Sequence, residues 1–241
     1  MPTKQKETGH TIIVGDVHAC RDETERLLDL ARFGPGDALY FLGDLLSRGP
    51  DPEGMIALIR RTGAKSVRGN HDDALLRWRA AQKSGDSDPP IKGSQRRIAE
   101  HLDEADWELL EGLPLFIDLP DHELRIVHAG VIPGLPMERQ PVEALLSMRY
   151  LGPNDEPIEK GGTVLWASVY EGPPHVVFGH NAQPEPQIHP WATGIDTGAV
   201  YGGRLTAVVL EKGQRMPPPE HRLDVLFSVP ASARYFEPPS R

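Results

Sequence analysis

The stretch TIIVGDVH, residues 11 to 18, decides the fold of this chain. Its first four residues are β-branched and mostly apolar, and they are followed at once by Gly15, Asp16 and His18. A short apolar run of this kind predicts a buried strand. The carboxylate and the imidazole then lie at the carboxyl end of the strand, where open α/β sheets bind ligands.

The same arrangement occurs four more times along the chain. In each case a short apolar run is followed directly by an amide, a carboxylate or an imidazole. These stretches are Gly43-Asp44 after LYFL, Gly69-Asn70-His71-Asp72 after SVR, His128-Ala129-Gly130 after RIV, and Gly179-His180 after VVF. A single Gly-Asp pair after a strand is usually a turn or a helix cap. Five such stretches in series indicate one shared site.

Apolar runs alternate with helical segments over the first 75 residues, and this pattern favours an α/β layered fold. Further strands are predicted at 38–42, 66–68, 163–166, 175–178, before Asp196 and at 205–211, with a hairpin of 115–119 and 124–128. Helices are predicted after Asp22 as N-cap, from about Asp51-Pro52, through Ala74 to Trp78, and around 95–111. Residues 83–94, rich in Pro, Gly and Ser, are predicted to form a surface loop.

A chain of 241 residues is long enough to bury one large core. We expect a catalytic domain over residues 1–213. The proline-rich segment 214–241 contains one apolar stretch, LDVLFSV, and we expect this segment to add a strand or to dock on the same domain.

Composition narrows the class of protein. The content of 39% apolar and 25% charged residues is ordinary for a soluble protein, and no apolar run approaches the roughly 18 residues of a membrane span. The net charge of -9 disfavours a nucleic-acid partner. One cysteine, Cys20, excludes an internal disulfide and suits a reducing compartment. We therefore expect a cytoplasmic protein without a membrane or nucleic-acid partner.

The polar residues at the predicted strand ends form a set of metal ligands. They offer carboxylate and amide oxygens and imidazole nitrogens, a combination suited to a pair of divalent transition ions. Without cations, buried carboxylates gathered in this way would be strongly disfavoured. The six candidates are Asp16, His18, Asp44, Asn70, His128 and His180.

These motifs carry a resemblance to a known family. With GDVH (15–18), GDLLSRGP (43–50), GNHD (69–72), HAG (128–130) and GH (179–180), the chain resembles the calcineurin-like metallophosphoesterases of the phosphoprotein-phosphatase superfamily. Within it, SVRGNHD, VVFGH and 195–210 resemble the bacterial symmetrical diadenosine tetraphosphatases and their broad-specificity phosphatase relatives. The implied fold is a central β-sandwich flanked by helices on both sides.

The resemblance also implies how the metal ligands are shared. Asp16 and His18 would hold one ion, and Asp44 would bridge it to the second. The second ion would be held by Asn70, His128 and His180. We expect two divalent ions, with manganese favoured and iron, cobalt and zinc left open.

Three residues are expected to act on the reacting phosphate. His71 would protonate the leaving oxygen, a task suited to an imidazole near neutral pH. Arg48 would hold the phosphate through its guanidinium. Asp72 would support His71 or the Arg48 loop, or else stabilise a helix N-terminus.

Two further residues are candidates for binding the substrate. Arg149 would be a second phosphate clamp, and Tyr201 would stack on a base.

Ser47 bears on the substrate. In the Ser/Thr protein phosphatases that the chain resembles, this position is usually an aspartate that helps to keep the catalytic histidine protonated, whereas the diadenosine tetraphosphatases carry a small uncharged residue. A protonated histidine matters most when the leaving group is poor, such as a serine alkoxide, because the leaving oxygen then needs a proton as the bond breaks. We therefore predict symmetrical cleavage of diadenosine tetraphosphate to two ADP, with broader phosphatase side activity. A protein phosphatase acting on phosphoproteins is the alternative, and a non-catalytic phosphate or nucleotide sensor a remote one.

Overall fold

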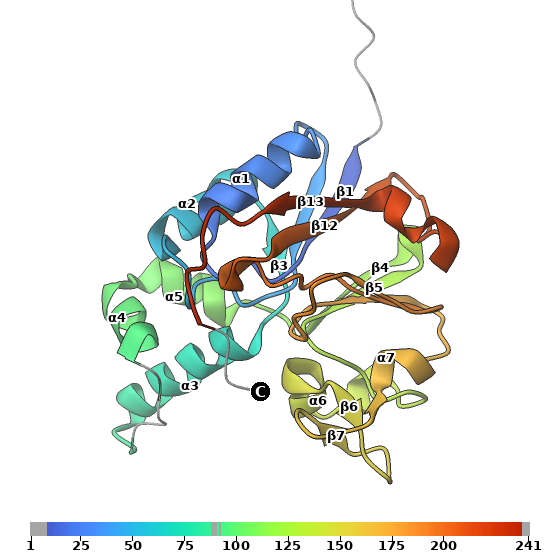
Figure 1. The fold of residues 1–241 in the computed structure, drawn as a ribbon. Helices are drawn as coiled ribbons and strands as arrows, with labels where there is room; N and C mark the ends of the chain where they lie inside the picture. The colour runs from blue at the N-terminus through green and yellow to red at the C-terminus, as the bar shows by residue number, and fades with distance from the viewer. Residues whose placement is uncertain (1–8, 88–90, 92, 238–241) are drawn as a thin grey trace, which may run out of the picture.

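Two five-stranded β-sheets pack against each other at the centre of the molecule (Figure 1). The computed structural model describes residues 9–87, 91 and 93–237. The first sheet consists, in spatial order, of β13 (Leu226–Pro230), β12 (Arg204–Glu211), β1 (His10–Val14), β2 (Ala38–Phe41) and β3 (Lys65–Ser66). The second consists of β10 (Gln187–Ile188), β11 (Ala192–Gly194), β9 (His175–Phe178), β5 (Leu124–Val127) and β4 (Phe116–Leu119).

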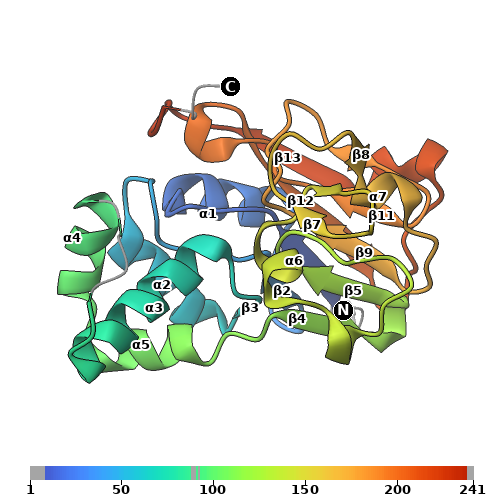
Figure 2. The same cartoon turned by 90° about the horizontal axis from the view of Figure 1, so that it is seen from below.

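Helices cover the outer face of each sheet (Figure 2). Beside the first sheet lie α1 (Arg21–Leu30), α2 (Pro52–Thr62), α3 (Asn70–Ser84), α4 (Gly93–His101) and α5 (Glu104–Glu111). Beside the second lie α6 (Val142–Ser147) and α7 (Trp166–Val169), with a small sheet of β7 (Pro157–Ile158), β6 (Tyr150–Leu151) and β8 (Val164–Leu165). The predicted fold, a β-sandwich with helices on both sides, is confirmed.

Strand β1 shows how the sequence produces this layering. Successive side chains of a strand point to opposite faces of the sheet. Ile12 and Val14 therefore join the apolar cluster beneath the helices, together with residues such as Leu27 of α1. Ile13 points the other way, into the cluster between the two sheets, where it is joined by Val177 of β9. All three β1 residues are fully buried, which explains why this segment is a continuous apolar run.

The direction of the strands places the site. β1 pairs with β2 in parallel, and β2 with β3, so their carboxyl ends lie at one edge of the first sheet. In the second sheet β5 pairs with β9 in parallel. The loops that follow these strands carry the polar stretches, and the parallel pairing places these loops close together at the carboxyl ends of the strands.

Several boundaries differ from the prediction. The strand expected at 66–68 pairs only at Lys65–Ser66, and the one at 163–166 is β8, because Trp166 begins α7. The helical stretch around 95–111 is two helices, since Asp103 caps α5 by accepting a hydrogen bond from the N–H of Asp106 at 2.8 Å. Of the loop at 83–94, residues 88–90 and 92 lie outside the described part of the chain.

The helix caps were only partly predicted. Asp51 does cap α2, and its Oδ1 accepts from the N–H of Gly54 at 2.8 Å. Asp22 is not an N-cap, because α1 already begins at Arg21 and Cys20 occupies the capping position. No helix in the described ranges, 9–87 and 93–237, is both long and apolar enough to cross a bilayer.

Residues beyond Gln214 contact both sheets. β13 pairs with β12 in the first sheet. The preceding 3-10 helix (Pro219–Val225) inserts the buried Arg222, whose Nη1 donates to Nε2 of His175 at 3.0 Å and also contacts Thr193 in the second sheet. Because the guanidinium can only donate, the neutral His175 ring carries its proton on Nδ1.

His175 should make the fold sensitive to acid. Burial, and then Arg222, lower the pKa of His175 to about 3. In the unfolded chain its pKa is about 6.5. Between these values the unfolded state binds one more proton, so stability is lost as the pH falls. Between pH 7 and 5 this group should cost about 2 kcal/mol in the free energy of unfolding.

Replacing His175 with Gln, whose amide oxygen can still accept from Arg222, should remove that contribution. Urea unfolding at pH 7 and pH 5 measures the difference between the variant and the wild type. His221→Gln is the matched control, because His221 is exposed on the 3-10 helix that carries Arg222. Equal pH dependence in all three proteins would contradict the role given to His175.

Candidate metal centre

The loops after β1 and β2 bring together the first three predicted ligands. Asp16, His18 and Asp44 are all buried, and each offers a ligand atom that lies within 4.8 Å of the other two. Asp44 Oδ2 lies 3.6 Å from Nε2 of His18 and 3.7 Å from Nε2 of His128. The Asp44 carboxylate thus stands between the two halves of the predicted site.

The other half is built around an amide. Oδ1 of Asn70, at the start of α3, lies 3.0 Å from Nε2 of His128 and 3.1 Å from Nδ1 of His180. The rings of His128 and His180 are in edge contact, with centroids 5.1 Å apart. The backbone N–H of His180 donates to Asp16 at 3.1 Å and so connects the two halves. All six predicted ligands therefore meet at one place.

The donor atoms of this cluster fit divalent cations. Nδ1 of His128 donates to the carbonyl of Leu42 at 2.7 Å, which leaves the lone pair of Nε2 facing the oxygen of Asn70. Burial lowers the pKa of His18 and of His180 well below the ordinary value, which disfavours the protonated form of both rings. Among the described residues, His180 Nε2 has no hydrogen-bond partner although it is buried. Acceptors that converge in this way are stabilised by a bound metal.

The carboxylates of the site repel one another. Burial, followed by Asp196 and Asp44, raises the pKa of Asp16 well above its ordinary value. Burial also opposes ionisation of Asp44, but the neighbouring His128, His71 and His18 outweigh it and hold the pKa of Asp44 low. Asp196 was not predicted as a site residue, although it too follows a predicted strand. The same sequence pattern would have identified it.

Backbone strain is concentrated at this site. Positive φ is uncommon for residues other than glycine. Eight such residues occur in the described part of the chain, and four of them are predicted site residues, namely His18 (φ 43°), Asp44 (53°), Arg48 (74°) and His180 (62°). Strained backbone of this kind persists where the surrounding contacts hold it, most often at functional sites.

Two glycines of the motifs are required by close packing. A Cβ on Gly69 would lie 2.2 Å from Oδ1 of Asp44, and one on Gly179 would lie 1.9 Å from Oδ1 of Asp16. Each glycine lets one loop press its backbone against a carboxylate on another. The repeated glycines of the sequence are therefore part of the site.

Asp72 and His71 both hold Asp44. The Asp72 carboxylate accepts hydrogen bonds from the backbone N–H groups of Asp44, Leu45 and Gly69 at 2.9 to 3.0 Å. Its contacts thus include the loop that carries Asp44 and Arg48. The backbone N–H of His71 donates to Oδ1 of Asp44 at 2.9 Å.

The His71 ring lies beside the metal ligands. Its centroid is 5.3 Å from that of His18. Its Nδ1 is 3.3 Å from Nε2 of the buried Gln95 on α4. Gln95 was not predicted as a site residue, because it lies in a helical stretch that matches no motif.

Arg48 reaches the centre from its own loop. Its Nη1 donates to Nε2 of His18 at 3.1 Å. The guanidinium lies 5.6 Å from the ring centroid of Tyr201 and 5.5 Å from that of Phe236, distances at which cation–π attraction operates. Tyr201 therefore lies next to Arg48. Phe236 was not predicted, since the only signal for it is an aromatic residue in the proline-rich tail.

The remaining two residues singled out from the sequence are Arg149 and Ser47. Nη2 of Arg149 is 3.4 Å from the carbonyl oxygen of His180, so this arginine also lies at the site. The hydroxyl of Ser47 is buried and, among the described residues, has no hydrogen-bond partner.

Comparison with known proteins now identifies the family. The model of the calcineurin-like phosphoesterases matches residues 9–211. The chain belongs to this family. Over 225 residues it is 31% identical to the asymmetrical bis(5'-nucleosyl)-tetraphosphatase PrpE of Halalkalibacterium halodurans, covering 81% of this chain and 88% of the relative.

Other family members carry different names. Serine/threonine-protein phosphatase 1 of Salmonella typhimurium is 31% identical, covering 83% of this chain and 92% of the relative. The symmetrical bis(5'-nucleosyl)-tetraphosphatase of Aeromonas hydrophila is 39% identical but covers only 50% of this chain and 44% of the relative. A crystal structure described as a candidate diadenosine tetraphosphatase is 35% identical, with a TM-score of 0.77 and coverage of 94% and 95%.

Gly69→Ala should damage the metal site. The added Cβ would push the Asp44 carboxylate away from His18 and His128, so we expect at least a tenfold loss of manganese affinity, or about 1.4 kcal/mol. Calorimetric titration with Mn²⁺ measures this loss. The control is Gly93→Ala, because a Cβ at Gly93 meets no atom within 4 Å. Wild-type affinity in the Gly69 variant would show that Asp44 does not contribute to metal binding.

Proposed function

We propose that the chain is a metal-dependent phosphohydrolase that cleaves a phosphoanhydride bond of dinucleoside tetraphosphates, with side activity on other phosphate esters. The convergence of six ligand side chains next to Arg48 and His71 is the observation that carries the proposal. The relative named tetraphosphatase that matches four-fifths of this chain supports the substrate class.

Each part of the site has a role in this proposal. Asp16, His18, Asn70, His128 and His180 would hold two divalent ions, manganese by preference, with Asp44 shared between them. When bound, such ions lower the pKa of water and neutralise phosphoryl oxygens during in-line attack.

The side chains around the ligands then act on the substrate. Arg48 binds the phosphate oxygens, with its guanidinium next to the rings of Tyr201 and Phe236. Arg149 binds the phosphate from the His180 side. His71 gives a proton to the leaving oxygen, and Asp72 fixes the loop on which Asp44 depends.

The uncharged Ser47 favours an anhydride substrate over a phosphoserine. A nucleotide is a good leaving group that needs little help from a protonated imidazole, whereas a serine alkoxide needs that proton. Ser47 supplies no charge to keep the imidazole protonated.

The single cysteine bears on the compartment of the protein. Burial, and then Glu23, raise the pKa of the Cys20 thiol to about 12. A single cysteine suits a reducing compartment, and we propose the cytoplasm.

The position of cleavage can be settled by the products. The sequence predicts cleavage at the central anhydride to two ADP, as the name of the symmetrical relative, which matches half of this chain, also indicates. The relative named asymmetrical matches much more of it, which makes ATP plus AMP the alternative. Anion-exchange chromatography of diadenosine tetraphosphate treated with manganese-loaded enzyme distinguishes the two outcomes. If the enzyme cleaves an aryl phosphate rapidly but not the dinucleotide, the proposed substrate is wrong. If it cleaves neither, a non-catalytic phosphate or nucleotide sensor becomes the favoured function.

A protein phosphatase is the second candidate, favoured by the relative from Salmonella typhimurium. Ser47→Asp tests it, because an added carboxylate at this position should help to keep His71 protonated. We expect kcat/KM for a phosphoserine peptide to rise about tenfold relative to the dinucleotide. Ser47→Asn, of similar size but uncharged, is the control. If the wild type already prefers the phosphopeptide, the dinucleotide is not the substrate.

A further inference from the structure

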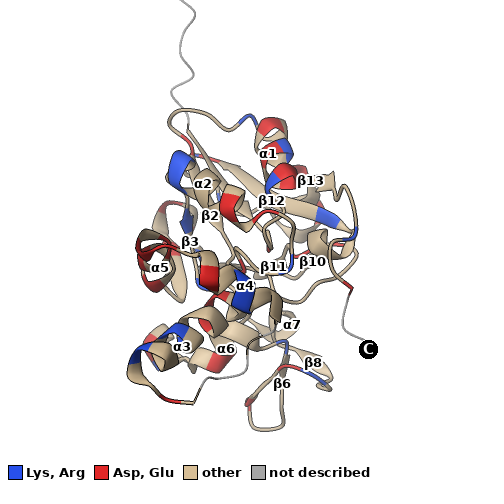
Figure 3. Cartoon of the chain, turned by 90° about the vertical axis from the view of Figure 1, so that its left-hand side faces the viewer, with Lys and Arg blue, Asp and Glu red and all other residues tan. Residues whose placement is uncertain are grey.

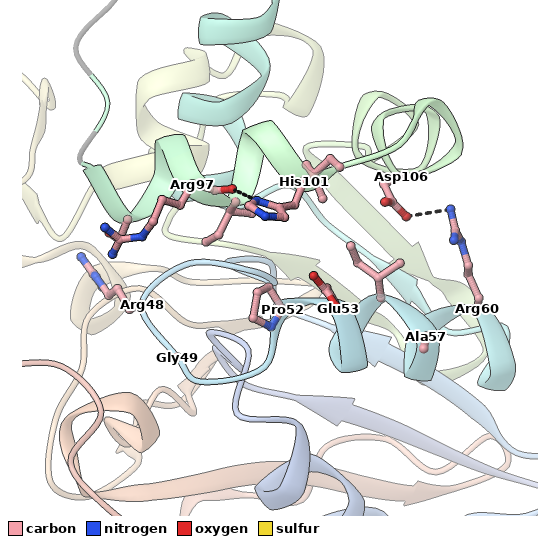
Figure 4. Close-up of a pocket in the computed structure, with 13 residues that line it drawn as sticks. Arg48, Gly49, Pro52, Glu53, Ala57, Arg60, Arg97, His101 and Asp106 are labelled. Atoms are coloured by element: carbon pink, nitrogen blue, oxygen red, sulfur yellow. Dashed lines mark hydrogen bonds and ion pairs between the residues drawn. The ribbon is translucent and has the colours of Figure 1, made fainter.

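A groove next to the metal centre is not used by the reaction described so far. It has a volume of about 510 Å³ and lies between α2 and α4, with Arg48 and Gly49 at one end and Asp106 of α5 at the other (Figure 4). This size is typical of sites for small organic ligands. Since Arg48 also touches His18, the groove begins where the phosphate is held.

Positive charge is concentrated at the end near the metal centre. Figure 4 shows Arg48 and Arg97 close together there, from opposite walls. Within the described part of the chain, the exposed Arg97 guanidinium has no acidic partner. Arg60, at the far end, is already paired with Asp106 at 2.8 Å. The basic part of α4 is blue in Figure 3, on a chain with a net charge of -9. This end is suited to a phosphate.

The middle of the groove combines apolar side chains with two polar ones, Glu53 and His101. Ile56 and Ala57 contribute from α2, and Ile98 and Leu102 from α4. Two apolar walls facing each other suit a flat aromatic ring. Beside them Glu53 offers an exposed carboxylate that can accept hydrogen bonds from hydroxyl groups.

The order of these features along the groove matches a nucleotide. A phosphate at Arg48 and Arg97 is followed by an apolar slot for a base, with a hydroxyl acceptor alongside. We propose that the α2–α4 groove binds one nucleoside of the dinucleotide together with the phosphate that joins it to the group held at the metal centre. This inference rests on the proposed function and adds the residues that recognise the nucleotide.

A phosphopeptide fits the groove less well. It carries one phosphate, which the metal centre and Arg48 already hold, and so leaves Arg97 without a charge to bind. A polyphosphate chain that extends from the metal centre into the groove would contact both Arg48 and Arg97.

The first test removes the charge of Arg97. In Arg97→Gln we expect kcat/KM for diadenosine tetraphosphate to fall about tenfold relative to that for an aryl phosphate, mainly through KM, because an interaction between a guanidinium and a phosphate is lost. Arg96→Gln is the matched control: it removes the same charge from the adjacent position, but Arg96 lies over the ring of Trp78 and not in the groove.

The second test fills the apolar slot. Ala57 is exposed on α2, so Ala57→Trp should place a ring in the groove without disturbing the core. We expect the same selective loss for the dinucleotide. Equal losses for the dinucleotide and the aryl phosphate, or none for either, would overturn the proposal. A selective loss for a phosphopeptide would also overturn it and assign the groove to peptides.

Inhibition separates this proposal from the proposed function. The inhibition constant of diadenosine tetraphosphate against aryl phosphate turnover by the manganese-loaded enzyme reports binding whether or not the dinucleotide is cleaved. If the dinucleotide inhibits without being cleaved, and Arg97→Gln weakens the inhibition about tenfold, the groove stands and the proposed function fails. If it is cleaved and neither variant changes its KM or inhibition constant, the function stands and the groove assignment fails.

Discussion

The buried carboxylate of Asp44 is the constraint on which the rest of the structure depends. Its Oδ2 lies between the imidazoles of His18 and His128, and its Oδ1 accepts from the backbone of His71. A buried anion is costly unless charge and hydrogen bonds compensate it. The surrounding residues supply that compensation, and a bound divalent cation would add to it.

Much of the surrounding architecture serves to hold this group. Asp72 fixes the backbone of Asp44 from the start of α3, and Gly69 leaves room for the carboxylate against that helix. The positive φ of Asp44 is maintained by these contacts rather than by local preference. Parallel pairing of β1, β2 and β3 then brings the Asp16 and Asn70 loops to the same edge.

The prediction of secondary structure was most accurate where the local sequence pattern and the burial of the element in the folded protein agree. Strands β1 and β9 are largely apolar and buried on both faces, and β2, β5 and β12 are mostly apolar, so their composition alone identifies them. The boundary between α4 and α5 was missed, because the Asp103 cap interrupts a stretch that is otherwise helical throughout. The two-residue strands β6, β7 and β10 were missed as well, because segments so short have no periodicity.

The sequence by itself identified the six polar side chains that the structure brings together, because they follow directly on strands whose positions can be read from apolar runs. Contributions from segments without a motif were decided only by the tertiary structure. Gln95 reaches His71 from a helix, Phe236 reaches Arg48 from the tail, and the α2–α4 groove exists only because two helices lie side by side. Local sequence specifies an element and its faces, but which distant surfaces meet depends on how the whole core packs.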